Sequence, residues 1–263
     1  MSDKIEIVES IENIDWGLEA IGAPKVWGKT KGKGVKIVVI DTGIDDSHPD
    51  LKVKFKMDMI NHTIDVEDEF GHGTHVAGLL TGLYTGVAPE AELHVIKVLD
   101  KDGNGSTANI MDGITYAISV KADVLSISLG APHEIPLILQ QRIVQAYEKG
   151  INIVSAVGNN GDHLPLYPAR MKEVIGVGGY NKNFNVTDFS NKGYDVLAPS
   201  VDILSTFKDG KYARMTGTSF ASPLVAGGIA LIISYYREQG RELSPKEIKA
   251  MISGKFDLTK LIN

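Results

Sequence analysis

The sequence predicts an α/β fold: one domain on a doubly wound, mainly parallel sheet with helices on both faces. Short runs rich in Val and Ile alternate with longer amphipathic stretches, which is the pattern of successive βα units. The runs are nearly continuous in apolar residues, as expected of strands that are covered on both faces. The chain has 263 residues, of which 43% are hydrophobic, so one sizeable core is possible. We find no internal repeat, low-complexity segment or linker that would divide it.

Five segments are expected to form strands and five to form helices. The expected strands are residues 35–41, 93–99, 123–130, 151–159 and 174–180. The expected helices are residues 72–84, 108–121, 136–149, 219–238 and 244–253. Gly150 fits the stop of the third helix, while Ser244 and Pro245 fit the cap and first turn of the last.

Three turn-rich segments follow the carboxyl ends of expected strands. They are DTGIDDSHPD at 41–50, DKDGNGS at 100–106 and GNNGDHLPLYP at 158–168. Open α/β sheets bind their ligands at this edge, so we expect the chemistry of the protein there.

Composition excludes several classes of function. The chain has no cysteine, which rules out disulfides, thiolate zinc sites and a cysteine nucleophile. Its net charge of −6 and its scattered Lys and Arg residues give no reason to expect a nucleic acid or an anionic membrane as partner. The longest apolar run, residues 224–233, is about half of what spans a bilayer, and the N-terminus has no apolar secretory segment. We therefore expect a soluble, cytoplasmic protein, whose oligomeric state the sequence does not indicate.

Three residues outside the apolar runs suggest nucleophilic catalysis when they are taken together. Asp41 ends a strand, His72 begins a helix between glycines, and Ser219 lies at the start of another helix. Each alone has an ordinary structural interpretation, as a turn cap, a helix-start residue or a helix cap. A serine hydroxyl becomes a strong nucleophile when a histidine takes its proton and a carboxylate orients that histidine.

The sequence resembles the subtilisin-like serine proteases in three blocks: VVIDTGID at 38–45, GHGTHVAG at 71–78 and GTSFASP at 217–223. The order Asp, His, Ser is that of the family, and the resemblance covers about residues 14–253. It implies a serine endopeptidase in which Ser219 attacks, His72 moves the proton and Asp41 orients His72, with no cofactor in the chemistry. Residues 13–263 would form the peptidase domain after a short extension, residues 1–12.

The resemblance also implies an oxyanion site and two substrate-binding segments. Asn159, in SAVGNNG, corresponds to the asparagine that stabilises the oxyanion in the family. Protein or peptide substrates would add as a β-strand between two edges. These edges are Gly103, Asn104 and Gly105 on one side, and Ser128, Leu129 and Gly130 on the other.

Several segments depart from the family pattern. Only about a dozen residues precede the matching region, which is too short for the usual pro-domain and resembles the cytoplasmic, intracellular subtilisins. The segment KIEIVES at 4–10 could cover the cleft or could equally be a frayed terminus. Residues 79–89 are too short for the loop that wraps a tightly held Ca²⁺ in the family. One weak structural calcium ion could still bind the carbonyls of Ala169, Met171 and Val174 with the Asp195 carboxylate.

Individual substitutions relative to the family bear on specificity. Leu166 stands where relatives commonly have glycine at the base of the pocket for the residue before the cut, so it should disfavour large aromatic residues. Phe220 replaces a methionine and Leu224 a histidine, neither of which takes part in proton transfer. We expect His75 and His48 to be structural.

Two other functions stay open at this point. The chain could be a dedicated cytoplasmic protease that removes leader peptides, which would cut few sites in an unfolded protein. It could also be a catalytically silent peptide-binding scaffold, although the complete catalytic blocks argue against this.

Overall fold

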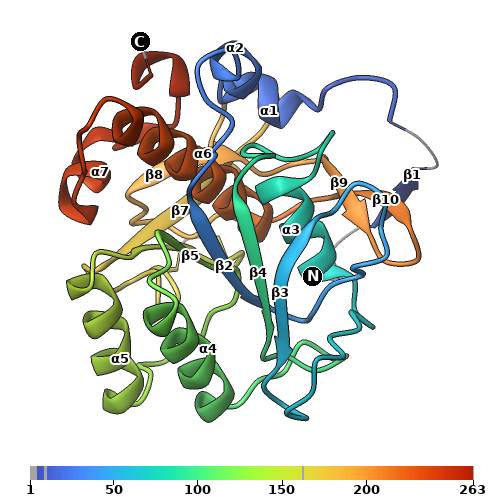
Figure 1. The fold of residues 1–263 in the computed structure, drawn as a ribbon, viewed down its shortest axis with the longest axis vertical. Coiled ribbons are helices and arrows are strands. Elements are labelled where there is room, and N and C mark those ends of the chain that lie inside the picture. The colour runs from blue at the N-terminus through green and yellow to red at the C-terminus, as the bar shows by residue number, and fades with distance from the viewer. Residues whose placement is uncertain (1–4, 9–10, 162, 263) are drawn as a thin grey trace.

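The computed structural model describes residues 5–8, 11–161 and 163–262. Its main sheet has eight strands in the order β11-β8-β7-β6-β5-β2-β4-β3, and every pairing in it is parallel (Figure 1). Five strands agree with the expected segments: β2 (Lys36–Asp41), β4 (Glu92–Lys97), β5 (Val124–Ile127), β6 (Asn152–Ala156) and β7 (Val174–Tyr180). The predicted mainly parallel α/β fold is confirmed.

Helices cover both faces of this sheet. Alternate residues of β2 point to opposite sides, with Ile37 and Val39 in one hydrophobic cluster and Val38 and Ile40 in another. The first cluster includes α3 (His72–Thr81) and α6 (Thr218–Glu238), whereas the second includes α4 (Thr107–Ser119) and α5 (Leu137–Glu148). In Figure 1, α4 and α5 lie together at the lower left, apart from α6.

The structure also contains elements that the apolar pattern does not indicate. They are β3 (Val53–Asp58), β8 (Val196–Pro199), β11 (Gly254–Lys255), α1 (Trp16–Ala20) and α2 (Ala23–Val26). The expected last helix is α7 (Pro245–Met251), capped by a reciprocal pair of hydrogen bonds between Ser244 and Glu247. A 3₁₀ helix (Leu258–Lys260) follows β11 near the end of the chain.

A second, antiparallel sheet has the order β1-β10-β9 and is formed by β1 (Glu6–Val8), β10 (Lys211–Met215) and β9 (Ile203–Phe207). Of the segment KIEIVES, residues 4, 9 and 10 lie outside the described residues. Its described part pairs with the edge of β10, where Ile7 faces Ala213. The expectation of a frayed terminus is thus wrong for residues 6–8, because they have a strand partner.

Helix α6 forms the centre of the larger core. An 18-residue window of it has a mean hydropathy of 1.5, and 89% of that window is buried inside the protein. Its length and composition would also suit a membrane span, but here its apolar side chains contact α3 and the sheet.

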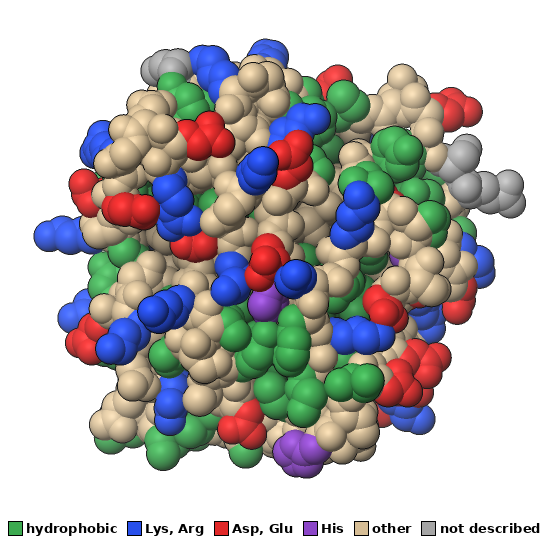
Figure 2. All heavy atoms as spheres, in the orientation of Figure 1, with side chains coloured by type: hydrophobic (Ala, Val, Ile, Leu, Met, Phe, Trp, Pro, Cys, Tyr) green, Lys and Arg blue, Asp and Glu red, His purple; other side chains and the backbone are tan. Residues whose placement is uncertain are grey.

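Figure 2 shows Lys, Arg, Asp and Glu side chains interspersed on one face of the molecule.

The strand order reverses direction at β2, which lies between β4 and β5. From β2 the chain proceeds to β3 and β4 on one side, and later to β5, β6 and β7 on the other. Ligands of open α/β sheets bind at such a switch point, beyond the carboxyl ends of the strands. Asp41 is the last residue of β2 and therefore lies at this point.

Candidate active site

Asp41 and His72 form a close pair at the switch point. The distance between His72 Nδ1 and Asp41 Oδ1 is 2.7 Å. The carboxylate is completely buried, and its Oδ1 also accepts a hydrogen bond of 2.8 Å from the backbone N–H of Thr42. A buried carboxylate held in this way fixes the orientation of the imidazole ring.

A second carboxylate, which the sequence analysis missed, fixes the start of α3. Asp68 is buried and accepts hydrogen bonds from the Thr42 hydroxyl at 2.7 Å, from the Gly71 N–H at 2.8 Å and from the Thr74 N–H at 2.7 Å. Because Thr42 follows Asp41 and Gly71 precedes His72, Asp68 joins the two chain segments that carry the pair. The signal in the sequence is an acidic residue just before a predicted helix, which is also an ordinary capping pattern.

Ser219 lies in the first turn of α6, beside the end of β5. Its hydroxyl donates to the Ser128 carbonyl oxygen at 3.4 Å, and the Ser128 hydroxyl donates to the Ser219 carbonyl at 3.2 Å. The neighbouring Phe220 ring lies with its centroid 5.5 Å from that of His72. The ring contact thus places the start of α6 near His72, while the hydroxyl of Ser219 itself is bonded to Ser128.

Asn159 follows β6 and is held against the start of α6. Its Oδ1 accepts hydrogen bonds of 2.9 Å from both the N–H and the hydroxyl of Thr218. The Thr218 hydroxyl also accepts from the Gly158 N–H at 3.2 Å. These contacts commit the oxygen of the Asn159 amide, and a Cβ atom on Gly217 would lie 3.2 Å from its Nδ2. Asn159 itself is exposed at this edge of the sheet.

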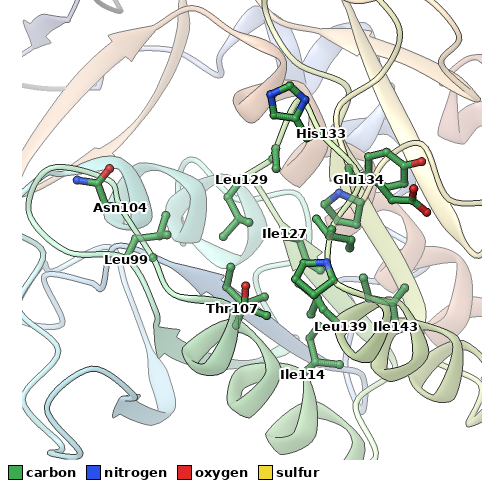
Figure 3. Close-up of a pocket in the computed structure, with 18 of the residues that line it drawn as sticks. Leu99, Asn104, Thr107, Ile114, Ile127, Leu129, His133, Glu134, Leu139 and Ile143 are labelled. Carbon is green, nitrogen blue, oxygen red and sulfur yellow. The ribbon is translucent and has the colours of Figure 1, made fainter.

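A cavity of about 390 Å³ lies between the two segments expected to bind substrate (Figure 3). Five of the six expected residues line it, while Ser128 lies at Ser219 instead. In Figure 3, Asn104 stands on one side and His133 and Glu134 on the other, with Ile114, Leu139 and Ile143 deeper between α4 and α5. The five expected lining residues are Gly103, Asn104, Gly105, Leu129 and Gly130.

The side chain of Leu166 fills a space between Gly130 and Gly158. A Cβ atom on Gly158 would lie 2.7 Å from Leu166 Cγ, and one on Gly130 would lie 2.9 Å from Leu166 Cβ. Gly158 immediately precedes Asn159, and Gly130 lies two residues after Ser128. The side chain of Leu166 therefore lies between the chain segments that contain Asn159 and Ser128.

Phe70, a second residue that the sequence analysis missed, borders His72. Its ring centroid is 6.4 Å from that of His72 in an edge-on arrangement, and a Cβ on Gly103 would lie 3.9 Å from it. The ring is 40% exposed, so it offers an apolar surface beside the histidine. Nothing in the sequence distinguishes Phe70 from the other aromatic residues on the surface.

The remaining histidines named in the sequence analysis have structural surroundings. His75 is completely buried, its Nε2 lies 3.0 Å from the Ala213 carbonyl, and burial lowers its pKa to about 3. His48 Nε2 lies 2.8 Å from the Lys211 carbonyl, and Nδ1 accepts from the Asp50 N–H at 3.1 Å. Leu224 is buried in the core, where it faces Gly17 of α1.

The short segment after α3 makes its own hydrogen bonds. The Asp50 carboxylate accepts from the Tyr84 N–H at 2.7 Å and from the Thr85 hydroxyl at 3.0 Å. The Gly86 N–H donates to the Gly82 carbonyl at 2.9 Å. These bonds close residues 82–86 into a compact turn against Asp50.

Comparison with known proteins shows the family to which the chain belongs. Residues 32–258 match the model of the Subtilase family of peptidases. The chain is 44% identical over 243 residues to an intracellular serine protease of Paenibacillus polymyxa, covering 85% of this chain and 74% of that protein. It is 40% identical over 269 residues to the major intracellular serine protease of Bacillus subtilis, covering 94% and 84%.

A relative that is named a subtilisin is similar as well. Subtilisin BL of Lederbergia lenta is 38% identical over 229 residues, covering 84% of each chain. The family match includes all three sequence blocks and the strands and helices that carry them. The chain belongs to the subtilase family and is a subtilisin-type serine endopeptidase.

Proposed function

We propose that Ser219, His72 and Asp41 form the catalytic triad of a cytoplasmic endopeptidase. Ser219 Oγ attacks the carbonyl carbon of the substrate while His72 Nε2 takes the hydroxyl proton, which it later gives to the leaving amine. The observation that carries the proposal is the 2.7 Å contact between His72 Nδ1 and the buried Asp41. With the Nδ1 proton donated to Asp41, the lone pair of the ring lies on Nε2.

Asn159 and the backbone N–H of Ser219 stabilise the oxyanion that forms in the transition state. The hydrogen bonds from Thr218 to Asn159 Oδ1 support this role, because they leave the amide N–H group free to donate. The start of α6 adds the positive end of a helix dipole. Loss of one such donor in a subtilisin reduces kcat by ~10²–10³.

The substrate binds as an extended strand between residues 103–105 and 128–130. The cavity between them takes one of its side chains, and its deep lining of Ile and Leu favours an apolar one. Residues 13–263 form the catalytic domain, and residues 1–12 are an extension to it. A cytoplasmic location is supported by the names of two relatives, which are intracellular proteases.

The triad is tested with Ser219→Ala and a matched control on the same helix. Ser222→Ala removes a buried hydroxyl one turn further along α6, so it reproduces the structural change without touching the nucleophile. We expect Ser219→Ala to lose nearly all peptidase activity and its labelling by a sulfonyl fluoride, whereas Ser222→Ala keeps both. Activity of Ser219→Ala equal to that of the control would refute the proposed mechanism.

The breadth of action is tested separately with unfolded casein. Cleavage at many sites, read by mass spectrometry, indicates a general protease. Cleavage at almost none, with sulfonyl fluoride labelling intact, indicates a dedicated processing protease instead. Absence of both cleavage and labelling would indicate a silent scaffold.

A further inference from the structure

Helix α7 carries a lysine whose ammonium group is surrounded by oxygen atoms. Lys249 Nζ donates to the Val174 carbonyl at 2.7 Å and to the Lys172 carbonyl at 3.1 Å, and it lies 3.0 Å from Asp195 Oδ2. The three oxygens come from the start of β7, the loop before it and the residue preceding β8. The ammonium group thus joins α7 to the beginnings of β7 and β8. Figure 1 shows where these three elements lie in the fold.

The number of contacts matches the chemistry of the group. A lysine ammonium has three N–H donors and no acceptor, and here each donor has one oxygen within hydrogen-bonding distance. Two neutral carbonyls and one carboxylate around a single positive charge are also the kind of environment that proteins offer to a metal cation.

Two of these oxygens belong to the donor set that the family resemblance suggested for a weak calcium ion. The Val174 carbonyl and the Asp195 carboxylate are both engaged by Lys249. Asp195 Oδ2 additionally accepts from the Gly176 N–H at 2.8 Å. Calcium requires roughly six to eight oxygen ligands, so this donor set does not fit a calcium ion while the ammonium is in place.

We propose that the Lys249 ammonium takes the place of a structural cation at this site. It acts as a tethered counter-ion between α7, the loop at 172–174 and Asp195. The stabilisation from a free cation depends on its concentration relative to its dissociation constant, whereas a tethered charge is present at any ionic composition. The stability of this part of the fold is therefore independent of dissolved metal ions.

The Lys249 contact fixes α7 and the following strand β11, which has only a short pairing with the main sheet. Strand β11, which follows α7, pairs with β8 through only two residues, and the Gly254 N–H donates to the Asp195 carbonyl at 3.2 Å. Ile248, beside Lys249, is buried in the larger core. Loss of the ammonium would leave the Asp195 carboxylate and two carbonyls facing each other without a cation.

The test compares Lys249→Ala with Lys246→Ala, which removes an exposed lysine from the same helix. Both are made in the inactive Ser219→Ala chain to prevent self-digestion. The melting temperature is measured by circular dichroism in a chelator, then with calcium chloride or potassium chloride added. In the chelator we expect Lys249→Ala to melt about 2–4 °C lower than the control.

Added calcium or potassium should raise the melting temperature of Lys249→Ala and leave that of the parent and of Lys246→Ala unchanged. In Asp195→Asn/Lys249→Ala, which lacks the carboxylate, the response should be abolished. Equal melting temperatures for the two single variants would overturn the proposal. So would a Lys249→Ala chain that is destabilised but insensitive to both cations, or a parent that responds to them as strongly as the variant.

Discussion

Replacing Leu166 by glycine should widen the pocket for the substrate residue that precedes the cut. Leu166 is half-buried, and it packs against the backbone of Gly130 and Gly158. Forcing a large aromatic ring into an occupied pocket typically costs about 1–3 kcal/mol. Because 1.36 kcal/mol corresponds to a tenfold rate, removal of the side chain should raise kcat/KM for a phenylalanine substrate by about 5- to 150-fold.

The assay uses chromogenic peptides that differ only at this position, with Phe, Leu or Ala. Wild type should favour Leu or Ala, whereas Leu166→Gly should favour Phe. Leu164→Gly is the matched control, because Leu164 lies on the same loop with its side chain 60% exposed, and it should keep the wild-type order. A wild-type preference for Phe, or an unchanged order in Leu166→Gly, would refute the reasoning.

Three further predictions concern pH, positioning and oxidation. Burial lowers the pKa of His75 to about 3. The contribution of neutral His75 to the free energy of unfolding should therefore be complete above pH 6.5, and it should be lost at about 1.4 kcal/mol per pH unit between pH 6.5 and about 3. Urea denaturation checks this, and His75→Gln should flatten the slope. Asp68→Asn should lower kcat by about tenfold or more with little change in KM, since it misplaces His72, and an unchanged kcat would contradict this role. Turnover should survive peroxide that inactivates Phe220→Met, because a sulfoxide would form beside Ser219; equal losses would place the sensitive residue elsewhere.

The central strands and the positions of the candidate site residues could be predicted because their signals are local. Continuous apolar runs marked β2 and β7, and the blocks around Asp41, His72 and Ser219 placed these residues at a strand end or a helix start, where the structure has them. The edge strand β3 and the hairpin of β9 and β10 were missed, since their sequences mix polar and apolar residues. Such strands are defined by their pairing partners rather than by their own composition.

Other features depend on contacts between distant segments. Asp68 could be recognised only as a possible helix cap, and its bond to Thr42 follows from how β2 and α3 meet. Lys249 looks like an ordinary surface residue of an amphipathic helix, and its partners become visible only when α7 packs beside β7 and β8. The sequence suggested acceptors for a cation but not that a side chain of the same protein supplies the charge.

The position of α6 near the end of the chain has a consequence for biosynthesis. The ribosome releases β2 to β8, with Asp41 and His72, before it releases the helix that carries Ser219. Until then one apolar face of the sheet is only partly covered, because α6 provides much of that cover alongside α3. Such long-range pairing is slow to form and leaves intermediates prone to aggregation. With Ser219 as the proposed nucleophile, the nascent chain cannot cut peptide bonds until α6 has emerged and packed, so folding itself delays the onset of proteolysis.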